Sequence, residues 1–204
     1  MSKTPIIVFE GIEGSGKTFH LNNVSKFLKK KKIKFLKIRE PGGSNNSEKI
    51  RSLIMNKSSN FDKLTDLFLY MASRNENYIN LISKSKGKKV ILIDRFTDST
   101  IAYQHYAMGI NLNLIKQFNK VILKNNLINF TFLHTVTMKN LKKRLKKRLN
   151  LNRYDTFSNN FYSKAQNGFM KLAKNKKNYM VIDSNKSIIE NKDRIISKVN
   201  QLIK

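Results

Sequence analysis

The sequence contains no cysteine among its 204 residues, and this absence excludes two kinds of structure. A disulfide framework cannot form, and no thiolate is present to hold a metal ion. A chain without cysteine is also compatible with a reducing cytosol.

Long hydrophobic runs are absent too. No apolar run approaches the roughly 18 residues of a membrane helix, and the N-terminal segment lacks the apolar core of a signal peptide. We therefore expect neither a signal peptide nor a membrane partner. With 204 residues and 40% hydrophobic content, the chain predicts one compact domain, 1–204, with a single core.

Acidic residues are scarce, with 13 Asp and Glu against 41 Lys and Arg, which gives a net charge of +28. An excess of this size is typical of proteins that bind nucleic acid. Here the charge is spread along the whole chain, and Lys, Asn, Ile and Phe, which share A/T-rich codons, are all abundant. We therefore favour a compositional bias over a specific nucleic-acid partner. The densest lysine run, 29–32, ends a predicted helix, where it complements the helix dipole.

Glycine is also scarce, with eight residues, yet three of them fall in one loop. Residues 11–18 read Gly-Ile-Glu-Gly-Ser-Gly-Lys-Thr and directly follow the apolar run 5–10. This is a G-x-x-x-x-G-K-[ST] phosphate-binding loop between a strand and a helix. Its backbone N–H groups favour a polyphosphate, and its lysine and threonine suit phosphate oxygens and Mg²⁺. The predicted nucleotide-phosphate ligands are Gly11, Ile12, Glu13, Gly14, Ser15, Gly16, Lys17 and Thr18.

A second part of the nucleotide site is predicted where the apolar strand 89–94 ends. Its last residue, Asp94, is placed to reach Mg²⁺, usually through water, and the alternative role is that of a helix cap or turn residue. Arg95 follows at once and can hold phosphate oxygens with its planar guanidinium group. Thr18 and Asp94 are therefore the predicted metal ligands.

Strand-like and helix-like segments alternate along the chain. The alternation predicts an α/β fold of three layers, a five-stranded parallel sheet with helices on both faces. Ligands of such sheets bind beyond the carboxyl ends of the strands. The predicted strands are 5–10, 33–38, 89–94, 128–136 and 179–183. The predicted helices are 17–31, 47–55, 61–83, 99–106, 112–125, 138–149, 157–175 and 187–203.

Several classes of phosphate-loop protein are disfavoured. A GTPase needs an N/T-K-x-D segment to read its base, and the nearest candidate here, Asn-Lys-Ser-Ser at 56–59, lacks the aspartate. A helicase would normally be longer or carry further motifs. A small P-loop kinase fits the length best.

Four segments together resemble the bacterial thymidylate kinase family, in order and spacing over nearly the whole chain. They are the phosphate loop with its preceding Phe-Glu, Arg-Glu-Pro-Gly-Gly at 39–43, Glu-Lys-Ile-Arg-Ser-Leu at 48–53, and Asp-Arg-Phe at 94–96 followed by Ser-Thr-Ile-Ala-Tyr-Gln at 99–104. Adenylate, guanylate and cytidylate kinases lack this combination. The resemblance implies a P-loop kinase fold with a short lid, and phosphorylation of dTMP to dTDP with ATP and Mg²⁺ by a cytoplasmic homodimer.

The resemblance also implies a set of dTMP-binding residues. Tyr70 and Arg74 lie four apart on a predicted helix, so they share a face; the family uses these positions to stack on thymine and to bind the base edge. Core packing and a solvated charge are the alternative roles. Tyr103 would lie under the deoxyribose, which favours deoxy substrates. The full set is Glu40, Pro41, Arg51, Tyr70, Arg74, Arg95, Ser99, Thr100, Tyr103 and Gln104.

The predicted lid covers residues 142–156. The family members that have no arginine in the phosphate loop, where this chain has Ser15, use lid arginines instead. The implied catalytic residues are therefore Lys17, Arg95, Arg148 and Arg153. A solvated basic helix face is the alternative interpretation of the lid.

The chain also departs from the family pattern. His134 stands where the family usually has Asp, and Asn152 where it often has an acid; we assign His134 no role. Two other functions stay open at this point: a different nucleotide or deoxynucleoside kinase of the same fold, and a basic P-loop ATPase stimulated by nucleic acid.

Overall fold

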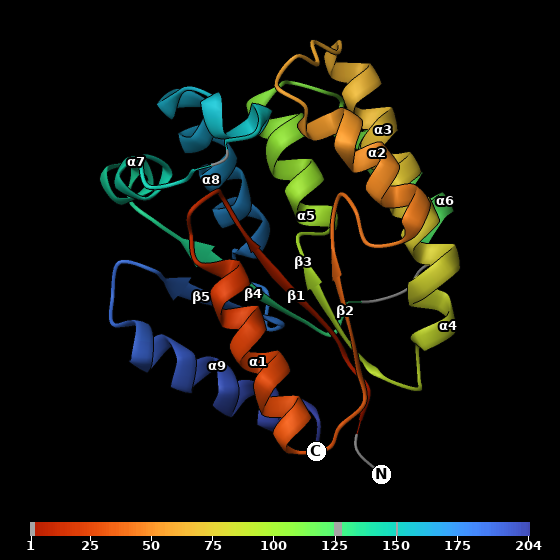
Figure 1. Ribbon diagram of the computed structural model, residues 1–204, viewed down its shortest axis with the longest axis vertical. Coiled ribbons are helices and arrows are strands. Elements are labelled where there is room, and N and C mark those ends of the chain that lie inside the picture. Colours follow the sequence, from red (N-terminus) through yellow and green to blue (C-terminus); the bar gives the residue numbers. More distant parts are fainter. Residues whose placement is uncertain (1–2, 125–127, 150) are drawn as a thin grey trace.

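A five-stranded parallel sheet forms the middle of the protein, in the order β2-β3-β1-β4-β5 (Figure 1). The computed structural model describes residues 3–124, 128–149 and 151–204. The sheet confirms the predicted fold class. Its strands are β1 (Ile6–Gly11), β2 (Phe35–Arg39), β3 (Val90–Asp94), β4 (Phe130–Thr135) and β5 (Tyr179–Asp183).

Helices cover both faces of the sheet (Figure 1). Helices α1 (Lys17–Lys30) and α9 (Ile188–Leu202) lie on one face. On the other lie α3 (Lys63–Asn77), α5 (Thr97–Thr100), α6 (Leu112–Leu123) and α8 (Asn159–Ala173). Helix α2 (Asn45–Met55) packs on α3, and α7 (Met138–Leu145) packs beside α8. No helix in these three described ranges is long and apolar enough to cross a membrane.

Strand β1 shows why the apolar runs are continuous rather than alternating. Ile7 and Phe9 pack towards α1 and α9, whereas Ile6 and Val8 pack towards α3. Both faces of the strand are buried, as in other parallel sheets. Phe9 lies in register with Asp94 of the neighbouring strand β3, so the phosphate loop that follows β1 lies beside the end of β3.

Two predicted helices are in fact composite. In the segment predicted as one helix over 61–83, the α-helix α3 ends at Asn77. A π-helical turn, η1 (Tyr78–Ile82), and the short helix α4 (Ser83–Ser85) follow it directly. The helix predicted near 99–106 consists of α5 followed by a π-helix, η2 (Ile101–Ala107). Helical periodicity in the sequence predicts that these segments are helical. It cannot distinguish the i→i+5 hydrogen bonds of a π-helix from the i→i+4 bonds of an α-helix, because tertiary packing decides between them.

The lid region also differs from the prediction. The helix expected over 138–149 ends at Leu145, because the basic residues of 142–148 repel one another at i,i+4 spacing. An unpredicted 3₁₀ turn, η3 (Arg153–Thr156), is capped reciprocally by Asn152 and Asp155. Residue 125 of the helix predicted over 112–125 and residue 150 of the predicted lid lie outside the described residues.

Candidate active site

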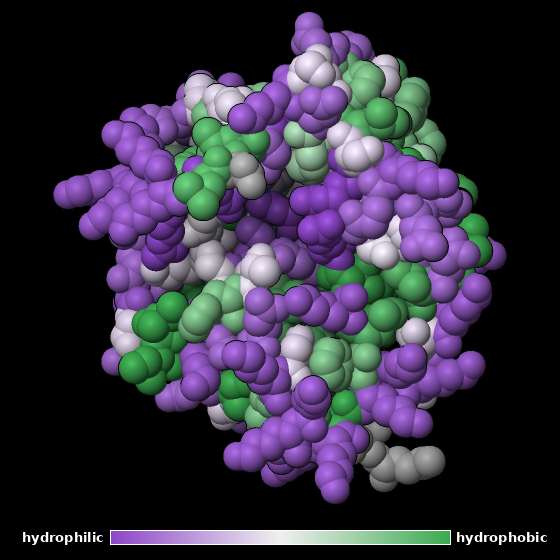
Figure 2. Space-filling view, in the orientation of Figure 1, coloured by the Kyte–Doolittle hydropathy of each residue, from purple (hydrophilic) through white to green (hydrophobic). Residues whose placement is uncertain are grey.

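A cavity of about 240 Å³ opens beyond the carboxyl ends of β1 and β3. Figure 2 shows it as a hollow with hydrophilic walls. The structure brings most of the sequence-predicted site residues together around it. Those that line the cavity are Glu13, Lys17, Thr18, Glu40, Pro41, Arg51, Tyr70, Arg74, Asp94, Arg95, Ser99, Thr100, Tyr103, Gln104 and Arg148.

The phosphate loop can form only because glycine stands at its two ends. Gly11 has φ 136°, and a Cβ there would lie 2.2 Å from the carbonyl oxygen of His134. Gly16 adopts a left-handed conformation directly before α1. The side chains of Ile12 and Ser15 are buried beneath the loop rather than in the cavity, so these residues can offer a ligand only their backbone.

Lys17 is the charged group at the floor of the cavity. Its Nζ donates to the carbonyl oxygen of Ile12 at 2.8 Å and to Ser15 Oγ at 3.4 Å. Burial, and then repulsion from Arg95, lower the pKa of Lys17 to about 7. An anionic ligand would raise that pKa again, so the site favours a polyphosphate.

The Thr18 hydroxyl donates to Asp94 Oδ2 at 2.7 Å, which joins the start of α1 to the end of β3. A hydroxyl and a carboxylate beside a phosphate site are hard oxygen ligands of the kind that Mg²⁺ uses together with waters and substrate phosphates. The described residues contain no cluster of three His, Cys, Asp or Glu side chains that could hold a metal ion without a substrate. The donor set therefore fits a magnesium ion that arrives with a nucleotide.

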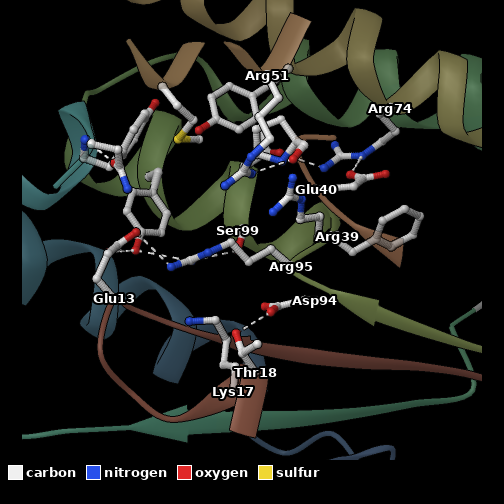
Figure 3. A pocket seen from close by; sticks show the side chains of 18 of the residues that line it. Glu13, Lys17, Thr18, Arg39, Glu40, Arg51, Arg74, Asp94, Arg95 and Ser99 are labelled. Carbon is white, nitrogen blue, oxygen red and sulfur yellow. Dashed lines mark hydrogen bonds and ion pairs between the residues drawn. The ribbon is translucent and has the colours of Figure 1, made fainter. Parts of the chain in front are cut away.

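Three arginines point into the cavity opposite Lys17 (Figure 3). Arg51 donates to the Pro41 carbonyl oxygen at 2.6 Å, and Arg39 forms an ion pair with Glu48. Arg95 donates to Gly11 O and Glu13 Oε1, both at 2.8 Å. Burial, and then repulsion from Arg39, lower the pKa of Arg51. This side of the cavity therefore carries surplus positive charge and suits a second anion.

Helix α3 forms another wall of the cavity and carries Tyr70 and Arg74. Arg74 is almost fully buried and donates to Glu40 Oε2 at 2.9 Å and to Thr100 Oγ1 at 3.0 Å. Burial raises the pKa of Glu40, and the charge of Arg74 opposes that rise. The solvated alternative for Arg74 is excluded, because its guanidinium group is held in place inside the protein.

Helix η2 supplies the next wall. Tyr103 Oη donates to Glu13 Oε2 at 2.5 Å, so the phosphate loop and η2 are joined by a direct hydrogen bond. Gln104 Nε2 donates to Tyr154 Oη at 3.3 Å. Tyr103, Gln104 and Glu13 all line the cavity.

The lid arginines occupy three different places. Arg144 donates to the carbonyl oxygens of Gly14 and Ser184, both at 2.7 Å, and so braces the phosphate loop. Arg148 pairs with Asp155 and lines the cavity. Arg153 pairs with the buried Asp66 and is not among the lining residues.

Comparison with known proteins gives a consistent result. The family model described as thymidylate kinase matches residues 9–195. The chain belongs to the thymidylate kinase family. It is 40% identical over 187 residues to a thymidylate kinase of Mycoplasma capricolum, covering 89% of this chain and 88% of the relative. It is 36% identical over 198 residues to one of Thermosipho africanus, covering 97% and 96%.

Comparison with solved structures also indicates the thymidylate kinase family. The crystal structure of thymidylate kinase from Ehrlichia chaffeensis superimposes with a TM-score of 0.78 at 30% identity. The match covers 96% of this chain and 98% of that chain. The P-loop kinase architecture predicted from the sequence is thus confirmed.

Sequence reasoning within the thymidylate kinase motifs missed several residues. Asp66 was overlooked, although it lies on the same helix face as Tyr70 and Arg74 at i, i+4 and i+8, and this spacing could have found it. The hydroxyl of Tyr154 donates to Asp66 Oδ2 at 2.6 Å, but no spacing in the sequence indicates this contact. The cavity is also lined by Arg39, Met55, Phe96, Asn152 and Tyr154.

Proposed function

We propose that this chain transfers the γ-phosphoryl group of ATP to the 5′-phosphate of dTMP, giving ADP and dTDP. The observation that carries the proposal is that the phosphate loop and a second cluster of cationic side chains share one cavity. A donor and an acceptor, both anionic, can meet there. Membership of the thymidylate kinase family supports thymidylate as the acceptor.

The donor nucleotide would bind at the phosphate loop. The backbone N–H groups of 11–18 and the start of α1 would hold the phosphates of ATP, with Lys17 reaching the β- and γ-phosphates. Thr18 and Asp94 would hold Mg²⁺, which neutralises phosphate charge when bound. Both side chains lie on rigid elements, so their positions are set before ligand arrives.

The acceptor would bind between α3 and η2. Arg51 and Arg95 lie where a 5′-phosphate could accept bidentate hydrogen bonds. Tyr70 and Arg74 lie on the wall that would face the base, with Thr100 held by Arg74. Tyr103 and Glu13 would lie under the sugar, where a 2′-hydroxyl would clash.

The reaction needs positioning more than proton transfer. An oxygen of the acceptor phosphate attacks the γ-phosphorus, and the bond from that phosphorus to the ADP oxygen breaks in line. The acceptor is already anionic, so no general base is required. Lys17, Arg51, Arg95 and the loop amides supply charge neutralisation around the cavity.

The test of this function is the release of ADP with a panel of acceptors. Turnover is expected with dTMP, and little with dCMP, dAMP, dGMP or thymidine. Addition of DNA or RNA should not raise ATP hydrolysis. Turnover that depends on nucleic acid instead of dTMP would replace the proposal with a nucleic-acid-stimulated ATPase, and another preferred monophosphate would replace the acceptor.

Of the two predicted lid arginines, Arg148 is the better placed to act on the transferring phosphoryl group. We expect Arg148→Ala to lower kcat by about 10²-fold or more, because it removes a donor aimed into the cavity. Its partner Asp155 has a fully buried side chain and keeps two hydrogen bonds from Asn152, so the Tm should fall as well. Arg153→Ala should act mainly on the Tm, because Asp66 is buried. Steady-state kinetics and thermal melts of both variants test this assignment. A larger loss of kcat in Arg153→Ala than in Arg148→Ala would show that Arg153 acts on the phosphoryl group instead.

A homodimer is also proposed, through the exposed apolar side of α3 and α6. Phe68 and Val121 are 47% and 73% exposed, and Phe68 packs edge-on against Phe118. Phe68→Asp is expected to turn a dimer into a monomer in sedimentation velocity, because a charge would then lie in an apolar contact. Ile189→Asp, on an exposed position of α9, is the control and should leave the dimer intact. A monomeric parent protein, or a dimeric Phe68→Asp variant, would refute this interface.

A further inference from the structure

Glu10 is a buried carboxylate that the proposed reaction does not use. It is 1% exposed at the end of β1 and accepts three hydrogen bonds from the segment after β3. Oε1 accepts from the backbone N–H of Phe96 at 2.8 Å and of Ser99 at 3.2 Å. Oε2 accepts from Ser99 Oγ at 2.5 Å. All three donors therefore belong to the start of α5.

These bonds replace the cap that α5 cannot provide for itself. Its N-cap residue is Phe96, whose side chain makes no capping hydrogen bond. In an ordinary capping box, two side chains serve the N–H groups of the N-cap and third helical residues. Here the single remote carboxylate of Glu10 serves both, those of Phe96 and Ser99. The start of α5 is thus fixed by strand β1.

The same contacts fix an unusual backbone conformation. Arg95 has φ 66°, in the left-handed region that residues with a side chain rarely adopt. Its N–H donates to the Phe9 carbonyl oxygen at 3.0 Å, and the next N–H, of Phe96, donates to Glu10. Two successive residues of β1 therefore hold the turn on which Arg95 lies. That turn sends its guanidinium group towards Gly11 O and Glu13.

We propose that Glu10 is a positioning residue for the acceptor phosphate, acting through Arg95 and Ser99; this rests on the proposed function. The carboxylate holds the turn from Arg95 to Ser99, and Arg95 then faces the phosphate without rearrangement. Packing alone does not account for a carboxylate here. Burial, and then the charge of Asp98, raise the pKa of Glu10 to about 7, so the ionised group is costly at this position.

The test compares Glu10→Gln and Glu10→Ala, with direct calorimetry of dTMP binding beside kinetics. Glutamine keeps one acceptor for the two N–H donors but loses the acceptor for Ser99 Oγ; alanine loses all three. We expect Glu10→Ala to weaken dTMP binding and raise its KM by about tenfold, the loss typical of a buried hydrogen bond to a charged group. Glu10→Gln should lie between alanine and the parent, while the KM for ATP changes little. Glu190→Gln, at an exposed position, is the matched control and should change nothing.

A double-mutant cycle with Arg95→Ala separates positioning from general stability. If Glu10 acts through Arg95 and Ser99, the double variant Glu10→Gln/Arg95→Ala should lose less dTMP affinity than the sum of the two single losses. Additive losses, or unchanged dTMP affinity in Glu10→Gln, would overturn the proposal. A parent enzyme that does not phosphorylate dTMP would overturn the proposed function instead. Because Glu10→Gln keeps the size and two of the hydrogen bonds, the test does not depend on the alanine variant folding.

Discussion

Replacing Lys17 by alanine is expected to lower the rate of phosphoryl transfer by about 10³-fold or more. Lys17 Nζ lies against the backbone of the phosphate loop and donates hydrogen bonds to Ile12 O and Ser15 Oγ. A bound γ-phosphate would offer it a far stronger partner. The alanine variant loses this charge at the point where negative charge shifts during transfer. Coupled ADP release with dTMP in excess measures the effect.

The same substitution should leave the fold in place. Lys17 is 6% exposed and forms no ion pair with another described residue, and its lowered pKa shows that burying its charge is costly. The Tm of Lys17→Ala should therefore equal or exceed that of the parent. Lys26→Ala, at an exposed position of the same helix, is the control and should affect neither quantity. Transfer at the parental rate in Lys17→Ala would remove this lysine from the mechanism.

Arg74→Ala is expected to damage both stability and dTMP binding. Its guanidinium group lies 2.9 Å from Glu40 Oε2, and the two side chains are 1% and 4% exposed. Removal leaves a buried carboxylate without its counter-charge, which typically costs about 3–5 kcal/mol. Thr100 and Asn119 also lose a donor. Thermal denaturation and the KM for dTMP report the two effects, and the exposed Arg194→Ala serves as control.

The loss of stability in Arg74→Ala should depend on pH in a definite direction. Burial already raises the pKa of Glu40 in the folded protein, and without Arg74 that pKa rises further. The folded state then binds a proton more tightly than the unfolded state, so stability falls as pH rises from the ordinary pKa of a glutamate to the raised one. The difference in Tm between variant and parent should thus be smaller at pH 5 than at pH 8. An equal difference in Tm at pH 5 and pH 8 would show that the charge of Glu40 is not the source of the lost stability.

Adding Glu40→Gln to an Arg74→Met variant should recover part of the stability, because the buried charge is removed along with its partner. The dTMP affinity should not recover. A double variant as unstable as Arg74→Met alone would place the cost in lost packing instead.

Much of the fold followed from the sequence because the signals were local. The phosphate loop, its strand and its helix are adjacent in the chain, and the strand 179–183 was predicted with the bounds that the structure has. Arg51 and Arg74 were predicted from the family resemblance and Arg95 first from its place at the end of a strand, and the structure places all three at one cavity. Their roles towards a substrate stay predictions.

What the sequence did not reveal depends on contacts between distant residues. Glu10 and Ser99 are 89 positions apart, and Arg153 and Asp66 are 87 apart. No periodicity marks such pairs. The π-helix η2 depends similarly on α8, where a Cβ on Gly168 would lie 2.5 Å from Tyr106. The backbone conformation of η2 depends on its packing against α8, and one sequence alone does not reveal that packing.

Seven of the eight arginines of this chain are held by ion pairs or hydrogen bonds in or near the cavity. An ammonium group is a point charge, and on an open surface one such cation can replace another without consequence. The planar guanidinium group of arginine donates hydrogen bonds in a fixed geometry, so lysine cannot replace it so freely. Overall charge can therefore drift in this protein while turnover stays constant, provided that the guanidinium groups bordering the cavity are kept. Those that line the cavity are Arg39, Arg51, Arg74, Arg95 and Arg148, whereas Arg144 and Arg153 bind Gly14 of the phosphate loop and Asp66.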